Sequence, residues 1–573
     1  MGDLGGVFYG LPLYPFFLAL VYKLFGLSYF AVKWVQLTLG VGTVYLVYQL
    51  GTKFFDRKTA LVGAWLAVFY GPLSFHELIF IPEALGIPLY AGSLLMAIHF
   101  FEKPDFKRAI GLGILFGFAM LSKAGILLFV FLFLLFFIRK SSSPIKIKSA
   151  ALCLLSFFLT LAPVTLHNLI RGKDFVLLTS HAGFNFYVGN HPGAEGVFSA
   201  PEGTGTSVEA QMDDSRAIAE REMGRTLKPS EISHYWSSKA WKYILDNPGE
   251  FLKLCGKKLV IFFDSREISD VEDYYFCGIF SEFIRFPWPN FVLLCPLLFA
   301  GLYFSFRARY GSILYLWIAS YLIGMVTFFV NARYRLPMLP VFFLIGAFGA
   351  VQGYENWKKG NRRELAFGLI ALACGIFVSQ AHLVGTDFVS GYVNAGDAIM
   401  EKNDYDRALA FYDKAIEVRP DYAKAHLGKA LCLTHMGRRE EAVEFYKKSI
   451  ELDPKSSQAW NNLGLWYDQN GDAEKAEEYF LKAIELKPSS SQAHNNLGTL
   501  YGKRGEIDKA TAEFEKSLAF NPASAKANSN LALMVYKQGD AARAKTLWEK
   551  ALELDPNYPE AKKALTILSQ RSS

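Results

Sequence analysis

The feature that most constrains the fold of this chain is a succession of apolar runs, each about 20 residues long, before residue 386. A helix of that length crosses the hydrocarbon core of a bilayer. Hydrophobic residues make up 52% of the 573 residues and aromatic residues 16%, a profile that soluble proteins of this size rarely have. We therefore predict an all-α chain whose residues 1–386 form a polytopic transmembrane helical domain with about 10 spans. The spans are expected near 32–51, 59–75, 83–101, 109–122, 124–140, 149–169, 287–305, 311–330, 336–355 and 364–385.

The remainder of the chain contains a repeat of 34 residues, marked by prolines at 420, 454, 488, 522 and 556. The clearest unit has Trp460, Leu463, Gly464, Tyr467, Gly471, Ala476, Phe480, Ala483 and Pro488. This is the pattern of the tetratricopeptide repeat, in which helix pairs stack into an α-solenoid. We predict five repeats over 389–558 and a capping helix over 559–573.

Solenoids of this type present a concave groove, so we expect the repeats to bind a protein partner or acceptor. A role in stability or spacing is the alternative. His426, His435 and His494 lie at helix positions without partner ligands, and we interpret them as surface or groove residues.

The distribution of basic residues predicts the topology of the membrane domain. Short loops rich in Lys and Arg alternate with loops that are not, and the positive-inside rule assigns the basic loops to the cytoplasm. The basic residues are Lys53, Arg57, Lys58, Lys103, Lys107, Arg108, Arg139, Lys140, Lys146, Lys148, Arg307, Arg309, Lys358, Lys359, Arg362 and Arg363. The segments 76–82, 122–123, 172–286 and 331–335 then face outward, as does the repeat domain.

The N-terminus also starts outside on this topology. Residues 11–30 are expected to form an amphipathic helix at the outer surface, because the apolar stretch is short and contains Lys23. The topology therefore predicts that a preceding transmembrane helix is missing from the chain.

Four ionisable residues, Glu83, Lys123, Arg333 and Arg335, lie at ends of apolar segments on the predicted outer face. Ionisable groups at such depths are costly and usually functional. A carboxylate with several cations at a membrane surface indicates a phosphate-bearing lipid substrate.

Simpler roles for the same residues remain open. Glu83 suits the first turn of the helix that follows Pro82, Lys123 suits snorkelling to head groups, and the two arginines suit interface anchors. His76 and Glu77 are weaker candidates for substrate or phosphate contact, with an interfacial polar role as the alternative.

The long outer segment 172–286 is too polar to cross the bilayer. We expect helices over 207–224 and 230–246, an irregular loop over 181–196, and a membrane-associated stretch over 254–264. In the irregular loop His181, Asn185, Asn190 and His191 either contact a sugar or pack within a loop cap.

A disulfide between Cys255 and Cys277 is one possibility, because both flank the segment predicted to lie outside the cytoplasm.

The composition and the cysteines argue against two other kinds of site. The cysteines have no metal-site spacing, and the soluble parts have no basic stripe with interleaved aromatics. We therefore predict no protein metal site and no nucleic-acid partner.

Several stretches of the membrane domain resemble a known family. They are VFYGLPLYPFFLALVYKLFG, residues 35–85, GLGILFGFAMLSKAGILLF, NFYVGNHPGAEG and NARYRLPMLPVF. In this order, over roughly 7–350, they resemble polyprenyl-phosphate-dependent glycosyltransferases of C-type fold (family 39), which include protein O-mannosyltransferases and aminoarabinose transferases.

The resemblance implies a mechanism and a location. A polyprenyl-phosphate sugar, undecaprenyl-linked in a bacterial inner membrane, would donate its sugar to a protein or cell-envelope acceptor on the outer, periplasmic face. Glu83 matches the second acidic position of the family and is the catalytic candidate; Lys123, Arg333 and Arg335 match the positions that hold the departing phosphate. A divalent cation is possible, and no other cofactor is implied.

The chain departs from the family pattern at the base. The family's acidic base lies upstream of the first residue here, and Asp3 is not expected to replace it. A non-catalytic, membrane-anchored repeat scaffold on a degenerate or truncated transferase domain is therefore the alternative function. A transporter or flippase is a weaker alternative, because the charges lie at helix ends rather than at mid-membrane.

Overall fold

The computed structural model describes residues 3–4, 7–8, 10–140, 144–198, 201, 204, 208–266, 286, 288–306, 308–383 and 389–572. They form two compact units, Met1–Thr386 and Asp387–Ser573, which are described separately below. Within the described residues the only paired strands are the two-residue strands β1 (Asp3–Leu4) and β2 (Val7–Phe8), which are antiparallel. The all-α prediction is therefore confirmed.

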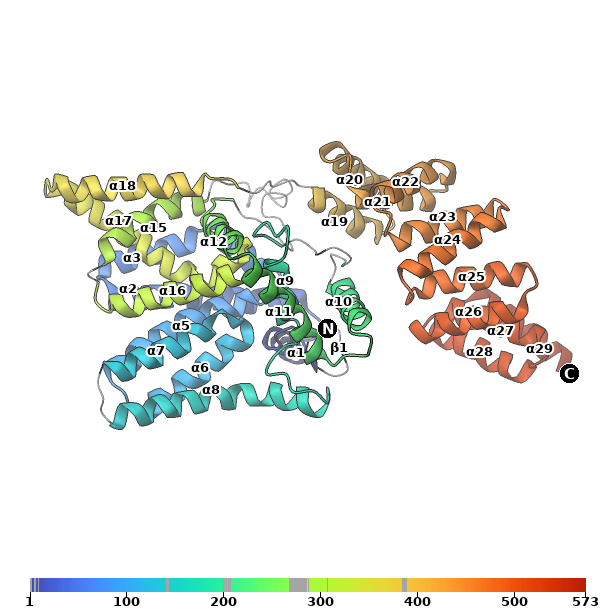
Figure 1. Ribbon diagram of the computed structural model, residues 1–573, viewed down its shortest axis with the longest axis horizontal. Coiled ribbons are helices and arrows are strands. Elements are labelled where there is room, and N and C mark those ends of the chain that lie inside the picture. The colour runs from blue at the N-terminus through green and yellow to red at the C-terminus, as the bar shows by residue number, and fades with distance from the viewer. Residues whose placement is uncertain are drawn as a thin grey trace. The chain divides into compact units, whose positions relative to one another are not determined.

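The first unit is built on apolar helices that lie side by side (Figure 1). They are α1 (Leu13–Phe25), α2 (Tyr29–Phe54), α3 (Arg57–Phe69), α4 (Gly71–Leu78), α5 (Glu83–Glu102), α6 (Phe106–Ser122), α7 (Leu127–Arg139), α8 (Pro144–Ile170), α15 (Phe291–Ser305), α16 (Gly311–Thr327), α17 (Leu339–Lys358) and α18 (Arg362–Ser379). Within the described residues, four segments are long and apolar enough to cross a membrane: Tyr29–Phe54, Glu83–Glu102, Ile145–Ile170 and Arg333–Lys358. Shorter apolar helices accompany them, so the expected number of about ten spans stays a prediction.

The starts of these helices follow local capping chemistry. Asp56 and Asp105 precede α3 and α6, and each side chain accepts a hydrogen bond from the backbone N–H three residues later. Such N-caps satisfy donors that a helix leaves unpaired at its first turn. The basic loops of the sequence therefore end in well-defined helix starts.

Small residues allow the helices to pack closely. A Cβ on Gly113 of α6 would lie 2.2 Å from the Cys153 carbonyl oxygen of α8, and one on Gly349 of α17 would lie 2.5 Å from the Leu297 carbonyl oxygen of α15. Glycine at these positions lets helix backbones approach, as is common between membrane helices. Buried Phe side chains fill the core around them.

The predicted cytoplasmic loops meet at one end of the helices. Lys53 Nζ lies 2.8 Å from Glu102 Oε2, and the Tyr310 hydroxyl donates to Glu102 Oε1 at 2.6 Å. Lys58 pairs with Glu355 at 3.4 Å in the same region. Glu102 ends α5 and Glu83 begins it, so about 30 Å of helix separates these loops from Glu83.

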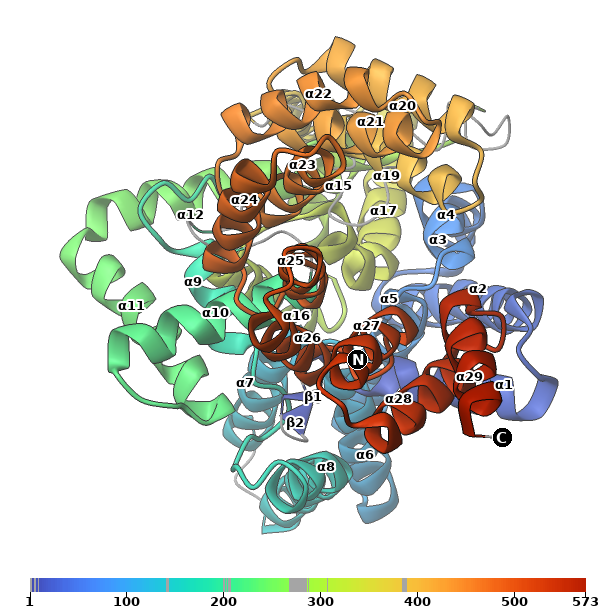
Figure 2. The ribbon, with the colours of Figure 1, turned by 90° about the vertical axis from the view of Figure 1, so that its right-hand side faces the viewer.

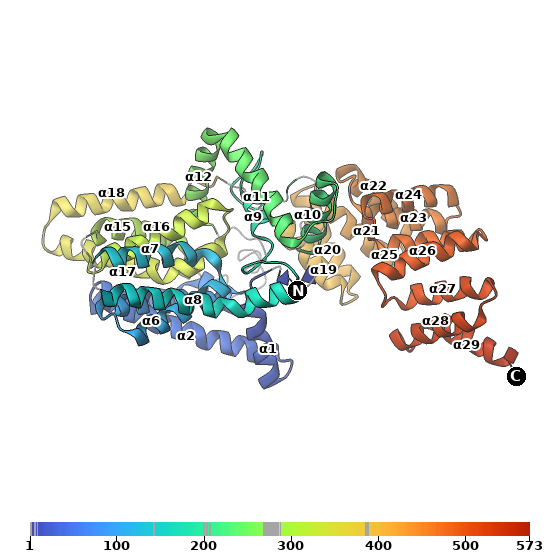
Figure 3. The ribbon, with the colours of Figure 1, turned by 60° about the horizontal axis from the view of Figure 1, so that its bottom comes forward.

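The segment predicted to face outward forms a helical subdomain, called the outer subdomain after that prediction, of α9 (Ala182–Gly189), α10 (Val208–Met223), α11 (Pro229–Asp246) and α12 (Pro248–Phe262). Figures 1 and 3 show α9, α10 and α11 gathered at one end of the apolar helices. The helices expected over 207–224 and 230–246 are confirmed. The irregular loop expected over 181–196 is wrong for residues 182–189, because Phe184 and Val188, one turn apart, pack into a cluster with Trp236 and stabilise a helix.

The second unit is a stack of helix pairs that follow one another in chain order (Figure 2). The pairs are α19 (Val389–Met400) with α20 (Tyr405–Val418), α21 (Ala423–His435) with α22 (Arg439–Leu452), α23 (Ser457–Gln469) with α24 (Ala473–Leu486), α25 (Ser491–Lys503) with α26 (Ile507–Phe520), and α27 (Ala525–Lys537) with α28 (Ala541–Leu554), followed by α29 (Pro559–Ser572). Gly464 and Gly498 lie against the rings of Phe480 and Phe514.

Two of the repeat histidines are buried rather than lying on the surface or in the groove. His494 is 4% exposed, with Nδ1 2.6 Å from Glu513 Oε2 and Nε2 3.0 Å from the Pro488 carbonyl oxygen. The Nε2 atom of His426 lies 2.7 Å from the Pro420 carbonyl oxygen. Both rings therefore tie a helix to the proline turn before it, which is a structural role.

Candidate functional site

Three of the charged residues singled out from the sequence meet at helix ends. Glu83 is the first residue of α5, Lys123 follows the last residue of α6 in extended conformation, and Arg333 lies in the 3₁₀ helix η2 (Ala332–Met338). The Asn331 side chain caps η2 by accepting from the Tyr334 N–H at 3.2 Å. The end of a helix therefore positions each of the three side chains.

The three charges form one cluster around a buried carboxylate. Lys123 Nζ lies 2.6 Å and Arg333 Nε 3.8 Å from Glu83 Oε1. The carboxylate side chain is 4% exposed, whereas Lys123 and Arg333 are 17% and 26% exposed. The cations therefore lie on the more accessible side of the cluster and the carboxylate lies behind them.

Aromatic side chains hold the two cations. The Lys123 ammonium lies 4.3 Å from the ring centre of Tyr334, a cation–π contact. The Tyr90 hydroxyl donates to the Lys123 carbonyl at 2.9 Å, and the Tyr321 hydroxyl donates to the Tyr334 carbonyl at 2.5 Å. The backbones that carry Lys123 and Arg333 are thus fixed by tyrosines from α5 and α16, which sequence reasoning did not identify.

A polar chain from the N-terminal helices supports the connection before Glu83. The Tyr14 hydroxyl donates to Gln36 Oε1 at 2.9 Å, and Gln36 Nε2 donates to the Ile79 carbonyl at 3.0 Å. Gln36 is fully buried within apolar α2. Gln36 could have been noticed in the sequence, because it is a polar amide within an apolar helical stretch.

His76 lies beside this cluster, in the short helix α4 outside the candidate spans. It is 7% exposed, and both ring nitrogens lack a hydrogen-bond partner among the described residues. Burial lowers the pKa of His76 to about 4; Glu83 acts in the opposite sense, and Arg335, Arg333 and Lys123 lower it further. The imidazole is therefore neutral at physiological pH and offers one donor and one acceptor. Glu83 Oε2 likewise has no partner in the described part of the chain.

Arg335 points to a different set of groups. Its guanidinium donates to the backbone carbonyls of Asp264 and Arg266, and it lies 4.3 Å from the ring centre of Phe291. Arg335 is only 3% exposed. Arg335 therefore attaches η2 to the segment that comes after α12. Direct contact between Arg335 and a phosphate stays a prediction.

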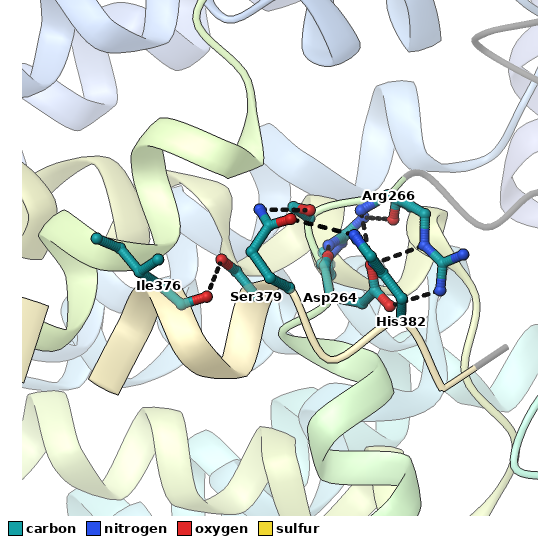
Figure 4. Close-up of polar contacts among 8 residues, drawn as sticks. Asp264, Arg266, Ile376, Ser379 and His382 are labelled. Carbon is teal, nitrogen blue, oxygen red and sulfur yellow. Dashed lines mark hydrogen bonds and ion pairs between the residues drawn. The ribbon is translucent and has the colours of Figure 1, made fainter. Parts of the chain in front are cut away.

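The segment held by Arg335 belongs to a polar cluster that joins α12 to the end of α18 (Figure 4). Asp264 accepts from Arg266 Nη2 at 2.9 Å and lies 3.2 Å from His382 Nδ1. The Ser265 N–H donates to the Ser379 carbonyl at 2.8 Å. Burial alone would raise the pKa of Asp264, but hydrogen bonds from Arg266 and His382 hold it below its usual value.

The outer subdomain is attached close to η2. Val330 donates its N–H to the Gly196 carbonyl at 2.8 Å. Asn190 is fully buried; its amide donates to the Thr327 carbonyl at 2.7 Å and its Oδ1 accepts from Lys258 Nζ at 3.0 Å. Asn190 therefore acts within a packed cap, the second of the two roles left open for it.

Lys258 is a buried cation that sequence reasoning missed. It is fully buried in α12, and its ammonium also donates to the Val326 carbonyl at 3.0 Å. Burial lowers the pKa of Lys258 to about 8. Its only sequence signal is its place in the apolar stretch 254–264.

Some expectations fall outside the described part of the chain. Glu77 lies in α4, but its side chain is not described, and the same is true of Asp3 in β1. Cys277 lies outside the described residues, and with it the possible disulfide to Cys255. Within the described residues no group of three His, Cys, Asp or Glu side chains has the arrangement of a metal site.

The arrangement is suited to anion binding. Among the described residues, Lys123 and Arg333 share the carboxylate of Glu83, and the buried Arg335 lies on the same 3₁₀ helix as Arg333. A phosphate that approached the exposed sides of Lys123 and Arg333 would meet charge-assisted donors in partly water-excluded surroundings. The neutral His76 is suited to a hydroxyl group instead.

Comparison with protein-family models assigns both parts of the chain. Residues 11–167 match the model described as dolichyl-phosphate-mannose-protein mannosyltransferase. Three tetratricopeptide repeat models match residues 400–464, 456–523 and 525–558. No curated protein matches the chain significantly.

Solved structures similar to this chain are repeat proteins. YrrB, described as a tetratricopeptide repeat protein with an unusual peptide-binding site, is 24% identical to this chain. The match covers 30% of this chain and 90% of YrrB, with a TM-score of 0.26. MamA is 27% identical over 29% of this chain and 92% of its own, with a TM-score of 0.25. PilF of Pseudomonas aeruginosa is 22% identical over 32% and 86%, with a TM-score of 0.30. The chain therefore joins an N-terminal region that matches the dolichyl-phosphate-mannose-protein mannosyltransferase model to a C-terminal region that matches tetratricopeptide repeat models.

Proposed function

We propose that the first unit transfers a sugar from a polyprenyl-phosphate donor to a protein or cell-envelope acceptor. The observation that carries the proposal is the cluster of Lys123 and Arg333 around the buried carboxylate of Glu83, at the ends of apolar helices. The family match to residues 11–167 supports the same class of reaction.

In the proposed reaction the acceptor oxygen forms a bond to the anomeric carbon as the bond from that carbon to the phosphate oxygen breaks. The electron pair of the broken bond stays on the phosphate, which leaves as a polyprenyl phosphate with one more negative charge. Lys123 and Arg333 stabilise that charge, and they act more strongly on the product than on the donor. The acceptor proton leaves to a base.

Glu83 has two roles in this proposal. Its Oε1 atom orients the two cations, and its Oε2 atom, which has no partner among the described residues, accepts a hydrogen bond from a substrate hydroxyl. His76 provides a neutral donor and acceptor beside it for a second hydroxyl. Arg335 positions η2 through the carbonyls of Asp264 and Arg266.

The setting of the reaction is also part of the proposal. We place the Glu83 cluster at the outer, periplasmic face of a bacterial inner membrane, because the basic loops lie at the opposite ends of the helices. The repeat unit then lies on the outer side as well, where it recruits the acceptor or a partner protein.

The experiment is sugar transfer from a polyprenyl-phosphate sugar by the purified chain in nanodiscs. Glu83→Gln is expected to reduce transfer by about 100-fold, because it removes the charge that orients the two cations. Arg335→Ala is expected to reduce transfer by a comparable factor, because η2, which carries Arg333, loses its bonds to the Asp264 and Arg266 carbonyls. Lys58→Gln is the matched control, because Lys58 pairs with a carboxylate at the other end of the helices.

Two outcomes would oppose the proposal in different ways. Full transfer activity in both Glu83→Gln and Arg335→Ala would show that the site lies elsewhere. Absence of transfer by the wild-type chain, with the repeat unit still binding a partner protein, would favour a membrane-anchored scaffold.

A further inference from the structure

The outer subdomain contains a cavity of about 690 Å³ between the end of α10 and the exposed face of α11. Its volume lies in the range of about 300–1,000 Å³ that is usual for small-molecule sites. Met223 and Leu227 provide apolar surface, and the ring of Tyr235 lies beside them. The cavity has no part in the phosphate cluster described above.

One face of α11 supplies most of the polar groups of the cavity. Ser230, His234, Ser238 and Lys242 follow one another at intervals of four residues, so they form a single stripe along the helix. The stripe extends over about 18 Å, because each residue of an α-helix adds about 1.5 Å. Hydroxyl, imidazole and ammonium groups in a row are suited to a chain-like ligand that carries many hydroxyl groups.

The charges of the cavity favour an anion. Three cations, Arg225, Lys239 and Lys242, line it together with one carboxylate, Glu231. Arg225 binds Glu231 through two hydrogen bonds of 2.7 and 3.2 Å, which lower the pKa of Glu231 to about 2 and leave the pair neutral overall. The ammonium of Lys239 pairs with Glu222 Oε1 at 2.8 Å and lies 4.9 Å from the ring centre of Tyr235. Lys242 has no ion-pair partner in the described part of the chain, so it supplies the positive charge that the neighbouring carboxylates leave uncompensated.

The cavity and the phosphate cluster adjoin the same buried hydrophobic cluster. Leu227 belongs to a buried cluster with Trp236 and Phe329, and Tyr235 and Tyr334 pack against the same cluster. The ring of Tyr334 in turn carries Lys123, whose ammonium lies 4.3 Å from the ring centre. The cavity and the place where we put the sugar transfer are therefore connected through this cluster and the Tyr334 ring.

We propose that this cavity binds an anionic glycan, which serves as the acceptor of the sugar. The apolar surface and the Tyr235 ring contact the faces of the sugar rings, and the α11 stripe binds their hydroxyl groups. Lys242 binds the acidic groups, together with Lys239, which keeps its ion pair with Glu222. The role as acceptor rests on the proposed transfer reaction, whereas the binding itself does not.

The test is binding of a hexameric oligogalacturonide to the full chain in nanodiscs of zwitterionic lipid. We expect saturable binding that weakens as salt is added, because the contacts are partly electrostatic. A neutral maltohexaose and a hexaglutamate peptide are expected to bind about tenfold more weakly or not at all. The double substitution Lys239→Gln with Lys242→Gln, and separately Tyr235→Leu, are expected to weaken glycan binding by about tenfold each.

Lys253→Gln is the matched control for the loss of a positive charge. Lys253 lies on α12 outside the cavity, and its one ion pair among the described residues is with neighbouring Glu250, at 2.7 Å. Equal binding of the glycan by wild type and the cavity variants would overturn the proposal. Tighter binding of the peptide, of maltohexaose, or of anionic lipid added to the nanodiscs would overturn it too, and would identify the true ligand class.

A further variant separates this proposal from the proposed function. Lys123→Met is expected to abolish sugar transfer and to leave glycan binding unchanged, because Lys123 does not line the cavity. Glycan binding without any sugar transfer by the wild-type chain would contradict the role of the glycan as acceptor but would support the proposed binding site. Transfer without glycan binding would remove the site and keep the proposed function.

Discussion

At the residue scale, a single carboxylate oxygen determines how two cations are held. Glu83 Oε1 lies 2.6 Å from Lys123 Nζ and 3.8 Å from Arg333 Nε, and the carboxylate is almost fully buried. Removal of one member of a buried pair leaves an uncompensated charge, whereas removal of both members is far less costly. The stability of single and double variants therefore separates the structural effect of the Glu83–Lys123 pair from its effect on sugar transfer.

We therefore predict a non-additive double-mutant cycle. Glu83→Gln is expected to lower the free energy of unfolding by about 3 kcal/mol, and Lys123→Met by less, because its ammonium is partly exposed. The double variant is expected to recover stability relative to Glu83→Gln, while sugar transfer stays lost. Thermal unfolding in detergent and transfer rates measure the two effects, and additive losses of stability would contradict the pairing.

His76 leads to a second prediction, because it is buried with no partner for either nitrogen in the described part of the chain. An unsatisfied buried polar group destabilises a protein, so His76→Leu is expected to keep or raise the unfolding temperature and to reduce transfer by about tenfold. Lower stability together with full activity would contradict the interpretation of His76 as a substrate-binding residue.

The same residue predicts a dependence of stability on pH. The pKa of His76 is lowered to about 4 in the folded protein, so between about 6.5 and 4 the unfolded chain binds more protons. Wild-type stability should therefore fall as the pH drops through this window, by at most about 3 kcal/mol from this residue. His76→Leu should lack that part of the decrease, and identical pH profiles of the two proteins would contradict it.

The sequence identified Glu83, Lys123 and Arg333 because charges stand out in apolar segments. It did not identify Tyr90, Tyr321 and Tyr334, although they fix the same backbone ends. With 29 Tyr and 50 Phe in the chain, an aromatic residue is no signal by itself. Arg335 looked equivalent to Arg333 in the sequence. Side chains two residues apart in the 3₁₀ helix η2 point in different directions, so the two arginines contact different groups.

At the scale of elements, the attachment of α9 depends on one buried amide and one buried ammonium. Asn190 accepts a hydrogen bond from Lys258 of α12 and donates one to the last turn of α16. These bonds fix the outer subdomain next to η2 and therefore next to Arg333. The attachment is a contact between segments that are far apart in the sequence.

We predict that Lys258→Met loosens α9 specifically. Loss of a hydrogen bond from a charged donor costs about 2 kcal/mol, which corresponds to about 30-fold faster amide exchange over Ala182–Gly189. Lys257→Met, which changes the adjacent lysine, is the control and should leave exchange unchanged. Hydrogen–deuterium exchange in nanodiscs measures it, and equal exchange in the two variants would contradict the attachment.

The elements themselves were predictable to different degrees. Long apolar helices such as α5 and the helix pairs of the repeats follow from period and composition alone. Helix α9 does not, because its glycines and aromatic residues favour a loop locally, and packing of Phe184 and Val188 on Trp236 decides the outcome. Tertiary contacts of that kind leave no local signal.

At the scale of the whole molecule, the distribution of charge predicts on which side of the membrane each part lies. Lys53, Lys58 and Tyr310 meet carboxylates at one end of the helices, while Glu83 and Lys123 meet at the other. The positive-inside rule places the first end in the cytoplasm. The sidedness of the two ends is therefore a prediction that is open to a direct test.

We predict that the repeat unit and the Glu83 cluster face the same, outer side. In a cysteine-free background, Asn470→Cys in the repeat unit should react with a membrane-impermeant maleimide in intact cells. Lys359→Cys, in a basic loop, should react only after the cells are permeabilised. The reverse labelling pattern would contradict the topology.

The central claim is that Lys123 and Arg333 bind the phosphate of a polyprenyl-phosphate lipid. It is tested most directly by the affinity of the purified chain in nanodiscs for polyprenyl phosphate, the proposed product, because this measurement needs no acceptor and no base. The account predicts that Lys123→Met and Arg333→Gln each weaken binding by about tenfold, and that Lys58→Gln has no effect. Equal affinity of all four proteins for polyprenyl phosphate would contradict it.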